Sequence, residues 1–192
     1  MKKCSTQPMN KRHNSKQPKR LSRSLSADAV KKIFAKLTND WFGMMHRLAL
    51  ATGMRVHEML NCLRSSIDWV AMTIRVIGKG DKERIVYFDE EFKHILKNYI
   101  EQHSAEKGCD LLFQNKGQGY SLCYFGGKAN TFCKRIGIRY TFHQLRHTFA
   151  TEQIKAGMKG EVLQKILGHE SIVTPKYVKK SNEQKKRKRT VK

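Results

Sequence analysis

The sequence predicts a mainly α fold with a small antiparallel β-sheet (α+β). Apolar residues recur at helical spacing before residue 64 and again after residue 88, which indicates amphipathic helices. Between these stretches, residues 67–88 form short runs of β-branched and aromatic residues separated by turns, which is typical of a small sheet. At 192 residues the chain is long enough for one domain whose core needs no disulfide.

The first part of the domain is expected to hold three helices. Ser26 has an N-cap side chain and precedes apolar residues that repeat at helical spacing up to Leu37. A second helix is predicted over residues 40–51, and Gly53 breaks it before a short third helix over residues 55–63. A Gly before an Arg at the start of a helix suits the binding of an anion.

The middle of the chain is expected to form the sheet. Strand-like runs cover residues 67–69, 73–77 and 84–88, and residues 78–82, Gly-Lys-Gly-Asp-Lys, supply a turn. Connections this short join antiparallel strands. The remaining predicted elements are helices over 89–103, 121–136, 144–156 and 160–167, and a brief extended link over 109–113.

Charge is the strongest signal in the composition. The chain has 39 Lys and Arg against 16 Asp and Glu, a net charge of +23, and a polyanionic partner screens such self-repulsion. Nucleic acid is the favoured partner, and an anionic membrane surface is the alternative. No stretch approaches the roughly 20 apolar residues of a membrane span. No apolar segment of a secretory signal follows the N-terminus. We expect a soluble cytoplasmic protein associated with the nucleoid, or a nuclear or viral one in a eukaryotic host.

Basic residues gather at both ends of the chain. Residues 1–24 contain eight Lys or Arg and no acid, and residues 176–192 contain nine with only Glu183 opposing them. Such runs are typical of disordered arms that hold phosphates without sequence preference; a solvated tail is the alternative. The run Lys185-Lys186-Arg187-Lys188-Arg189 is predicted to bind DNA and also fits a nuclear import signal.

Metal-dependent chemistry has few candidate residues. Two-metal enzymes need clustered carboxylates, and the acids at residues 89–91 lie at an expected helix start, where the helix dipole explains them. The run His143-Gln144-Leu145-Arg146-His147 departs from the zinc-hydrolase motif H-E-x-x-H, because Gln144 replaces its Glu. The five cysteines form no C-x-x-C pair and are expected to be reduced structural thiols. We expect no metal and no cofactor.

Four motifs and a tyrosine follow one another along the chain. They are Ala51-Thr52-Gly53-Met54-Arg55-Val56-His57-Glu58-Met59-Leu60, Ile77-Gly78-Lys79-Gly80-Asp81-Lys82-Glu83-Arg84, His143-Gln144-Leu145-Arg146-His147-Thr148-Phe149-Ala150-Thr151 and Leu167-Gly168-His169, followed by Tyr177. Together they resemble the tyrosine recombinases, the phage integrases and Xer-like site-specific recombinases, over residues 25–179. A single G-K-G or L-G-H would be weak, whereas four matches in this order are specific.

The resemblance implies roles for five cations or acids. Arg55 and Arg146 would hold the non-bridging oxygens of the scissile phosphate, which suits a planar guanidinium that stays charged. Glu58 resembles an acid that supports the active site. Lys79 would protonate the departing 5′-hydroxyl, with Lys82 as its neighbouring rival. Surface ion pairs and simple phosphate binding are the alternatives for these residues.

The resemblance also implies the imidazoles and the nucleophile. His143 and His169 would assist proton transfer and bind the pentacoordinate phosphate. Tyr177 would attack phosphorus and form a 3′-phosphotyrosyl link, so that neither ATP nor a metal is needed. The interval from His169 to Tyr177 is eight residues where nine is usual, and Pro175 limits helix within it. The residues predicted to contact DNA are Lys82, Arg84, Lys185, Lys186, Arg187, Lys188 and Arg189.

The expected organisation is a basic arm over residues 1–24, a tyrosine recombinase catalytic domain over 25–180 and a basic tail over 181–192. The resemblance implies a domain without the helical core-binding domain that precedes it in most relatives. We expect monomers that assemble as tetramers on double-stranded DNA, with no small-molecule substrate. The predicted activity is site-specific recombination leading to integration, excision or inversion. A DNA-binding relative without activity and a nicking-closing enzyme of the type IB topoisomerase kind are the alternatives.

Overall fold

A computed structural model describes residues 24–78 and 83–168 of the chain. The helices are α1 (Ala27–Phe34), α2 (Trp41–Thr52), α3 (Val56–Leu60), α4 (Glu90–Gln102), α5 (Leu122–Ile136), α6 (Phe142–Lys155) and α7 (Gly160–Leu167), with a 3₁₀ turn, η1 (Arg64–Ser66). The strands are β1 (Ile67–Asp68), β2 (Thr73–Ile77), β3 (Glu83–Tyr87), β4 (Gln114–Asn115) and β5 (Gln118–Gly119). The predicted fold class, mainly α with a small antiparallel sheet, is confirmed.

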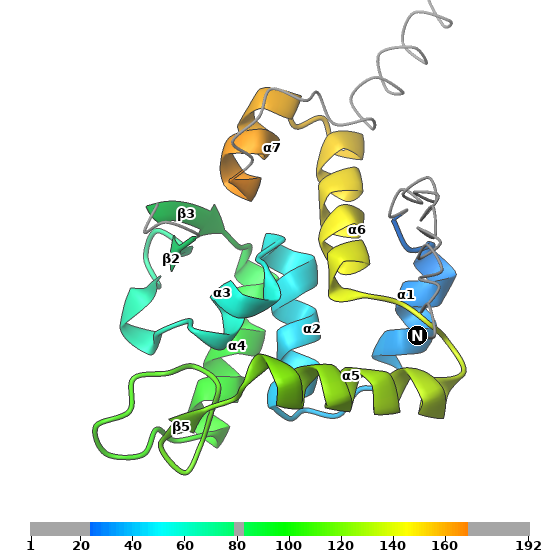
Figure 1. Ribbon diagram of the computed structural model, residues 1–192. Coiled ribbons are helices and arrows are strands. Elements are labelled where there is room, and N and C mark those ends of the chain that lie inside the picture. Colours follow the sequence, from blue (N-terminus) through cyan, green and yellow to red (C-terminus); the bar gives the residue numbers. More distant parts are fainter. Residues whose placement is uncertain (1–23, 79–82, 169–192) are drawn as a thin grey trace, which may run out of the picture.

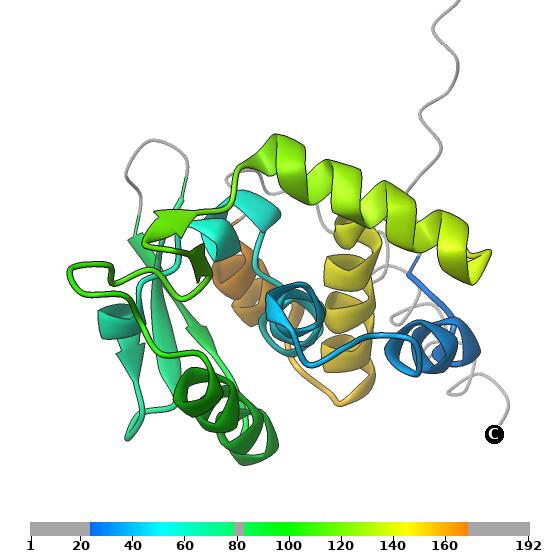
Figure 2. The same ribbon diagram turned by 90° about the horizontal axis from the view of Figure 1, so that it is seen from below.

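Helix α2 occupies the centre of the fold. Seen along its axis, it has the sheet and α4 on one side and α6 with α1 on the other (Figure 2). Helix α5 runs below α2 and α6, and α7 lies at the opposite end, between β3 and α6 (Figure 1). None of the helices in the described part of the chain is long and apolar enough to cross a membrane.

Side-chain caps set the starts of several helices. The hydroxyl of Ser26 accepts a hydrogen bond from the N–H of Ala29 at 3.2 Å, as the sequence predicts. Helix α6 begins at Phe142, two residues earlier than predicted, because Thr141 caps it and Gln144 returns a bond to the N–H of Thr141 at 3.0 Å. This reciprocal pair is a capping box, which orphan amide groups at a helix start favour.

Two predicted helices are shorter in the structure, and one hairpin is additional. Helix α1 ends at Phe34. Helix α3 ends at Leu60, and Leu63 forms an isolated bridge with Leu111 instead of continuing the helix. Strands β4 and β5 form a hairpin within a region that the sequence leaves without strands. Its turn places Lys116 and Gly117 at φ of 50° and 77°, a conformation that two-residue hairpin turns require.

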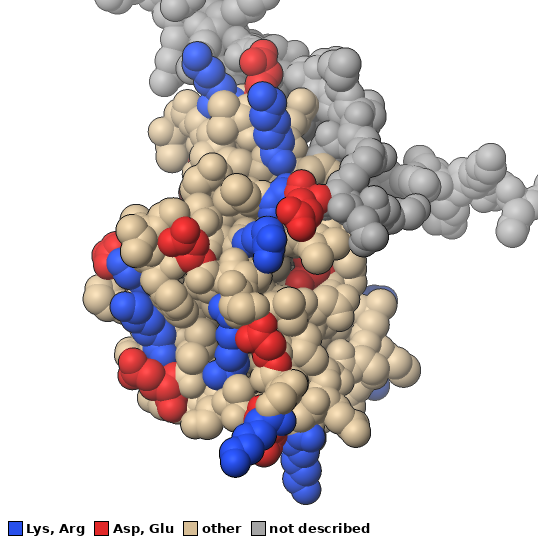
Figure 3. Space-filling view, turned by 90° about the vertical axis from the view of Figure 1, so that its left-hand side faces the viewer, with Lys and Arg blue, Asp and Glu red and all other residues tan. Residues whose placement is uncertain are grey.

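The register of the sheet decides which side chains face the core. Strands β1, β2 and β3 are antiparallel neighbours in that order, and Val76 pairs with Arg84. Side chains alternate between faces along a strand, so Arg84 shares the inner face with Val86, which is buried. On the outer side, Arg75 and Glu83 lie 4.0 Å apart, and Figure 3 shows basic and acidic residues interspersed on this side of the molecule.

A buried histidine connects α2 to the segment that precedes α6. His46 is fully buried, its Nδ1 lies 2.7 Å from the carbonyl oxygen of Phe42, and its Nε2 meets the hydroxyl of Tyr140. Because a carbonyl only accepts, the proton is on Nδ1, and Tyr140 donates to Nε2. The neutral ring therefore satisfies both partners, and burial lowers the pKa of His46 from 6.5 to about 4.

Protonation of His46 is expected to destabilise the fold at mildly acidic pH. Its pKa is lower in the folded than in the unfolded chain, so the unfolded chain binds more protons below pH 6.5. The free energy of unfolding should fall by about 3 kcal/mol as the pH drops from 6.5 to 4. Urea unfolding at a series of pH values measures this loss.

A His46→Gln variant is the control for this titration. His143 also has a lowered pKa and contributes in the same direction, so the difference between wild type and variant isolates His46. The slope of unfolding free energy against pH should flatten in the variant between pH 6.5 and 4. An equal slope in both proteins would contradict the assignment.

Candidate active site

The C-terminal end of α7 collects three arginines. The last carbonyls of a helix have no partner within it, and three consecutive ones here each accept a hydrogen bond from a guanidinium that comes from another element. The pairs are Arg84 Nε with Ile166 O (2.9 Å), Arg146 Nη2 with Leu167 O, and Arg55 Nη2 with Gly168 O (3.1 Å). Guanidiniums from β3, α6 and the start of α3 are thereby brought side by side.

Arg146 is the most deeply buried of the three. It lies one turn inside α6 and is 4% exposed. Besides Leu167, its guanidinium binds the carbonyl oxygen of Gly53 at 2.6 Å, at the C-terminal end of α2. Two carbonyls from two helices therefore fix the plane of this guanidinium, which is the orientation that two-point binding of an anion requires.

Arg55 is the more accessible cation. It is the N-cap residue of α3, and its side chain remains 34% exposed. Its Nη1 contacts Glu58 at 3.0 Å, and its backbone N–H donates to the other carboxylate oxygen of Glu58 at 2.7 Å. The side chain is thus held from one side by Glu58 and from the other by Gly168, with part of its surface open to a ligand.

Glu58 is a buried carboxylate shared by two arginines. Its side chain is fully buried, and both of its oxygens accept from Arg84, one of them at 2.7 Å. Burial alone would raise the pKa of Glu58, but the hydrogen bonds and charges of Arg84 and Arg55 outweigh it and lower the pKa from 4.5 to about 2. Glu58 is therefore ionised at neutral pH.

Two glycines allow the elements to approach at this point. Gly53 and Gly168 both have a left-handed backbone, with φ of 68° and 62°. A Cβ on Gly53 would lie 2.5 Å from the ring of Phe149, and one on Gly168 would lie 3.0 Å from Cδ of Arg84. Glycine at both positions therefore permits the turn and the close contact together.

His143 lies on the first turn of α6. It is exposed, and its ring meets that of His147 edge to face with centroids 4.6 Å apart. Partial burial and the positive charges of Arg146 and Arg55 lower the pKa of His143 below its ordinary value of 6.5. The imidazole is accordingly neutral at pH 7 and can exchange a proton or hydrogen-bond beside the two cations.

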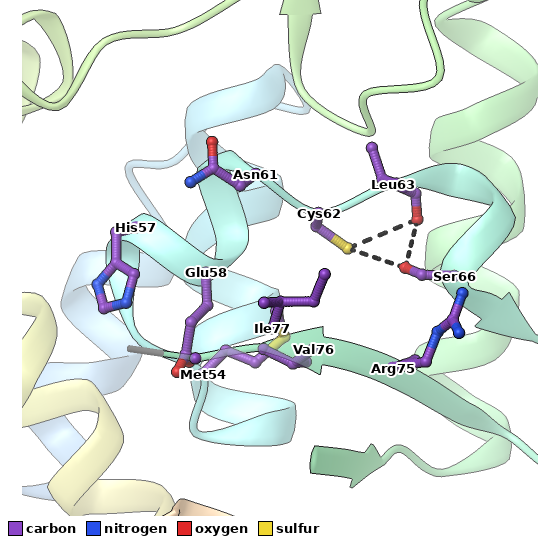
Figure 4. A pocket seen from close by; sticks show the side chains of 11 residues that line it. Met54, His57, Glu58, Asn61, Cys62, Leu63, Ser66, Arg75, Val76 and Ile77 are labelled. Carbon is purple, nitrogen blue, oxygen red and sulfur yellow. Dashed lines mark hydrogen bonds between the residues drawn. The ribbon is translucent and has the colours of Figure 1, made fainter. Parts of the chain in front are cut away.

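A cavity of about 490 Å³ lies between α3 and β2, and Glu58 is one of the residues that line it (Figure 4). Its wall includes Cys62, whose thiol donates to the carbonyl oxygen of Leu63 at 3.8 Å. Burial raises the pKa of this thiol to about 12, so it is protonated and a poor nucleophile. The four cysteines in the described part of the chain are all free thiols.

The five described tyrosines are engaged elsewhere. Burial raises the pKa of Tyr99, Tyr120 and Tyr140, and the hydroxyl of Tyr140 is bound to His46. Tyr124 stacks on Tyr120. Tyr87 lies on the outer face of β3, whereas Arg84 lies on the inner face of the same strand. Tyr177, the remaining tyrosine of the sequence, stays the candidate nucleophile.

The structure therefore brings together the predicted residues Arg55, Glu58 and Arg146, with His143 close enough for both cations to affect its pKa. Apart from Arg84, the other predicted site residues lie outside the described part of the chain, as do most of residues 1–24 and all of 181–192. Those site residues are Lys79, Lys82, His169, Tyr177, Lys185, Lys186, Arg187, Lys188 and Arg189.

Arg84, which the sequence analysis takes as a DNA contact, has partners within the protein. Its side chain is 11% exposed, and both ends of its guanidinium bind Glu58. The alternation of β3 contains the signal, because an inward Val86 places residue 84 on the same face. Its contact with DNA stays a prediction.

The arrangement suits the binding of a phosphate. Two guanidiniums lie at the end of α7, and a neutral imidazole is close enough for both to affect its pKa. Such donors stabilise charge that develops on phosphoryl oxygens. Within residues 24–78 and 83–168, no three His, Cys, Asp or Glu side chains are grouped so that they could hold a metal ion. The guanidiniums can supply electrostatic stabilisation, and the imidazole can exchange a proton.

Comparison with known proteins gives a consistent picture. The model of the phage integrase family matches residues 19–184. Tyrosine recombinase XerA of Saccharolobus solfataricus is 43% identical over 129 residues, which are 67% of this chain and 42% of the relative. Tyrosine recombinase XerC of Staphylococcus aureus is 35% identical over 143 residues, 71% of this chain and 48% of the relative. The chain thus spans about half the length of these relatives.

Solved structures agree with the sequence matches. The crystal structure of XerA recombinase superposes with a TM-score of 0.68 at 30% identity, over 81% of this chain and 59% of that one. The Tn1549 transposon integrase, solved in complex with a circular intermediate DNA, gives a TM-score of 0.70 at 20% identity, over 86% and 63% of the two chains. The second likeness supports the fold.

Proposed function

The chain belongs to the phage integrase family, and we propose that it cuts and rejoins DNA strands at a specific site through a covalent 3′-phosphotyrosyl link to Tyr177. The observation that supports this most directly is the pair Arg55 and Arg146, held side by side at the end of α7. The family match covers residues 19–184, which include both arginines.

In the proposed reaction the two arginines bind the non-bridging oxygens of the scissile phosphate. The Tyr177 hydroxyl attacks phosphorus, the bond to the 5′-oxygen breaks, and that oxygen takes a proton from Lys79 and leaves as a 5′-hydroxyl. His143 and His169 hydrogen-bond the phosphate and move protons. Attack by the 5′-hydroxyl of another strand restores the phosphodiester and the free tyrosine, so the number of phosphodiester bonds is conserved.

Chain length allows Tyr177 to reach the arginines. It is nine positions after Gly168, whose carbonyl binds Arg55, and nine extended residues span up to about 30 Å. His169 directly follows Gly168 in the sequence. This span is compatible with attack within one subunit and with attack on DNA held by a neighbouring copy.

The proposed partner is double-stranded DNA, on which four copies assemble. Two relatives of known structure, the Tn1549 integrase and the XerH recombinase, are described in complex with DNA. We propose a catalytic domain over residues 25–180, a range that the family match of 19–184 supports. The basic residues of 1–24 and 181–192 would add phosphate contacts that weaken as salt rises, and Lys82 would add another.

Covalent capture tests the proposal. DNA duplexes with randomised protein-binding sequences on either side of a central region, and a nick next to the expected cleavage point, are incubated with the protein in EDTA. Cleavage then releases a short fragment that diffuses away, so that no 5′-hydroxyl is left to reverse the reaction and the covalent protein–DNA link persists. We expect adducts that survive SDS, an inverted repeat enriched in the captured DNA, and a nucleotide remnant on Tyr177 after nuclease and protease digestion.

The same assay separates the alternatives. Enrichment of bound DNA without any adduct would identify a binding protein without activity. Adducts that show no sequence preference, together with relaxation of supercoiled plasmid and no strand exchange, would identify a nicking-closing enzyme. Either outcome would overturn the proposed function.

A further inference from the structure

Arg84 makes three contacts that involve two other elements. Its side chain extends from the inner face of β3. The two terminal nitrogens donate to the two carboxylate oxygens of Glu58 on α3, and Nε donates to the carbonyl oxygen of Ile166 on α7. The side chain is 11% exposed and the carboxylate is fully buried. This is a two-point ion pair in a buried environment, the geometry in which arginine is not replaceable by lysine.

The charges in this cluster explain what Arg84 can do. Arg55 and Glu58 alone would form a neutral pair, in which the carboxylate competes with any anion for the Arg55 guanidinium. With Arg84 satisfying both oxygens of Glu58, the three residues together carry one positive charge, and the exposed part of Arg55 is where that charge meets solvent. A second, buried positive charge on Arg146 lies beside it.

Steric contacts tie Arg84 to the same point. A Cβ on Gly168 would lie 3.0 Å from Cδ and 3.4 Å from Nε of Arg84, and 3.7 Å from Nη1 of Arg55. The end of α7 therefore packs on both arginines together. A shift of Arg84 would displace Glu58 and the carbonyl row of α7, and both of these orient Arg55.

We propose that Arg84 is a positioning residue: it neutralises Glu58 and so leaves the Arg55 guanidinium available to the scissile phosphate. This inference rests on the proposed function, since the phosphate is that of the cleavage step. Arg84 touches neither the DNA nor the nucleophile in this role. It acts through Glu58 and through the end of α7.

The test compares Arg84→Met with the double variant Arg84→Met/Glu58→Gln on DNA enriched by covalent capture. Single-turnover cleavage at saturating protein should fall roughly 10- to 100-fold in Arg84→Met, as for residues that orient the ligands of a metal site. The double variant should cleave at least about fivefold faster than Arg84→Met, the scale of coupling between contacting residues. Loss of stability alone would not produce this rescue at saturating, folded protein.

Binding measurements distinguish this role from a direct DNA contact. In Arg84→Met the carboxylate of Glu58 holds Arg55 away from the phosphate, so the salt slope should fall by about 1. The double variant removes this competition, and its dissociation constant and salt slope should return to within about twofold of wild type, whereas loss of a direct phosphate contact of Arg84 would lower the slope in both variants. A double variant that is no faster than Arg84→Met, or whose salt slope stays lowered, would overturn the proposal. Arg75→Met is the matched control, because Arg75 lies on β2 with its side chain 64% exposed, and its cleavage rate should be unchanged.

Folding and activity controls keep the outcomes distinct. If Arg84→Met shows no cooperative unfolding, the double variant is used alone, because it leaves no buried charge unpaired. A wild-type salt slope and a cleavage rate within roughly tenfold of wild type then support the positioning role, and any other result overturns it. Wild-type cleavage with a full rate in folded Arg84→Met overturns only the positioning role. A wild type that forms no adduct overturns the proposed function, and this inference with it.

Discussion

Replacement of Tyr177 by Phe is expected to abolish the covalent protein–DNA adduct, with a loss of at least about 10⁴-fold in strand cleavage. The change removes one oxygen atom, the atom that would be bonded to phosphorus in the intermediate. The benzyl ring remains, so the affinity for the enriched DNA should stay within about twofold. SDS gel analysis of end-labelled suicide DNA measures the adduct, and a mobility shift measures the binding.

Tyr124→Phe is the matched control for this variant. Tyr124 is an exposed tyrosine on α5 that stacks on Tyr120, and its loss of a hydroxyl should leave the adduct at the wild-type level. Burial in the fold explains why Tyr99 and Tyr140 cannot substitute, because a buried phenol with a raised pKa is a poor source of phenolate. Persistent adducts in Tyr177→Phe would show that another residue is the nucleophile.

Removal of the Arg146 guanidinium should reduce both activity and stability. In Arg146→Ala the phosphate loses an oriented cation, for which a loss of roughly 10²- to 10³-fold in cleavage is expected. The carbonyls of Gly53 and Leu167 also lose a buried donor, which destabilises by about 1–3 kcal/mol for each unsatisfied group. Arg146→Lys keeps the charge but cannot bind two carbonyls and a phosphate in one plane, so it should recover only part of either loss.

Urea unfolding and single-turnover cleavage separate the two effects of Arg146. Arg135→Ala is the control, because Arg135 also donates to a carbonyl, that of Lys36 at 3.3 Å, but lies exposed near the end of α5. Its cleavage rate should be that of wild type. An Arg146→Ala protein that is folded and cleaves at the wild-type rate would exclude a role for this guanidinium in phosphate binding.

Local signals predicted most of the fold. The cap at Ser26 and the break at Gly53 are properties of a few adjacent residues, and each appears in the structure where the sequence places it. The β4–β5 hairpin is the largest omission. Its strands are two residues each, too short for an alternating pattern, and their pairing depends on the backbone of the turn between them.

The site was predictable in its residue types but not in its connections. Motif resemblance identifies Arg55, Glu58 and Arg146, since each lies within a recognisable run of sequence. The ion pair between Arg84 and Glu58 was not predictable in this way. It depends on the register of β3 against β2 and on the packing of α7, and both involve contacts between residues that are not adjacent in the sequence. His46 likewise gives no signal in the sequence, because its partner Tyr140 is 94 residues away.

The row of carbonyls at the end of α7 affects which substitutions the protein can tolerate. An eight-residue helix is marginal on its own, so α7 depends on its apolar contacts and on the guanidiniums that terminate it. The guanidiniums that would bind the phosphates of a DNA strand thus also stabilise the C-terminal end of a helix. Directed evolution that replaces these arginines would destabilise α7, so we expect substitutions that stabilise α7 elsewhere to appear first in any variant that keeps its fold.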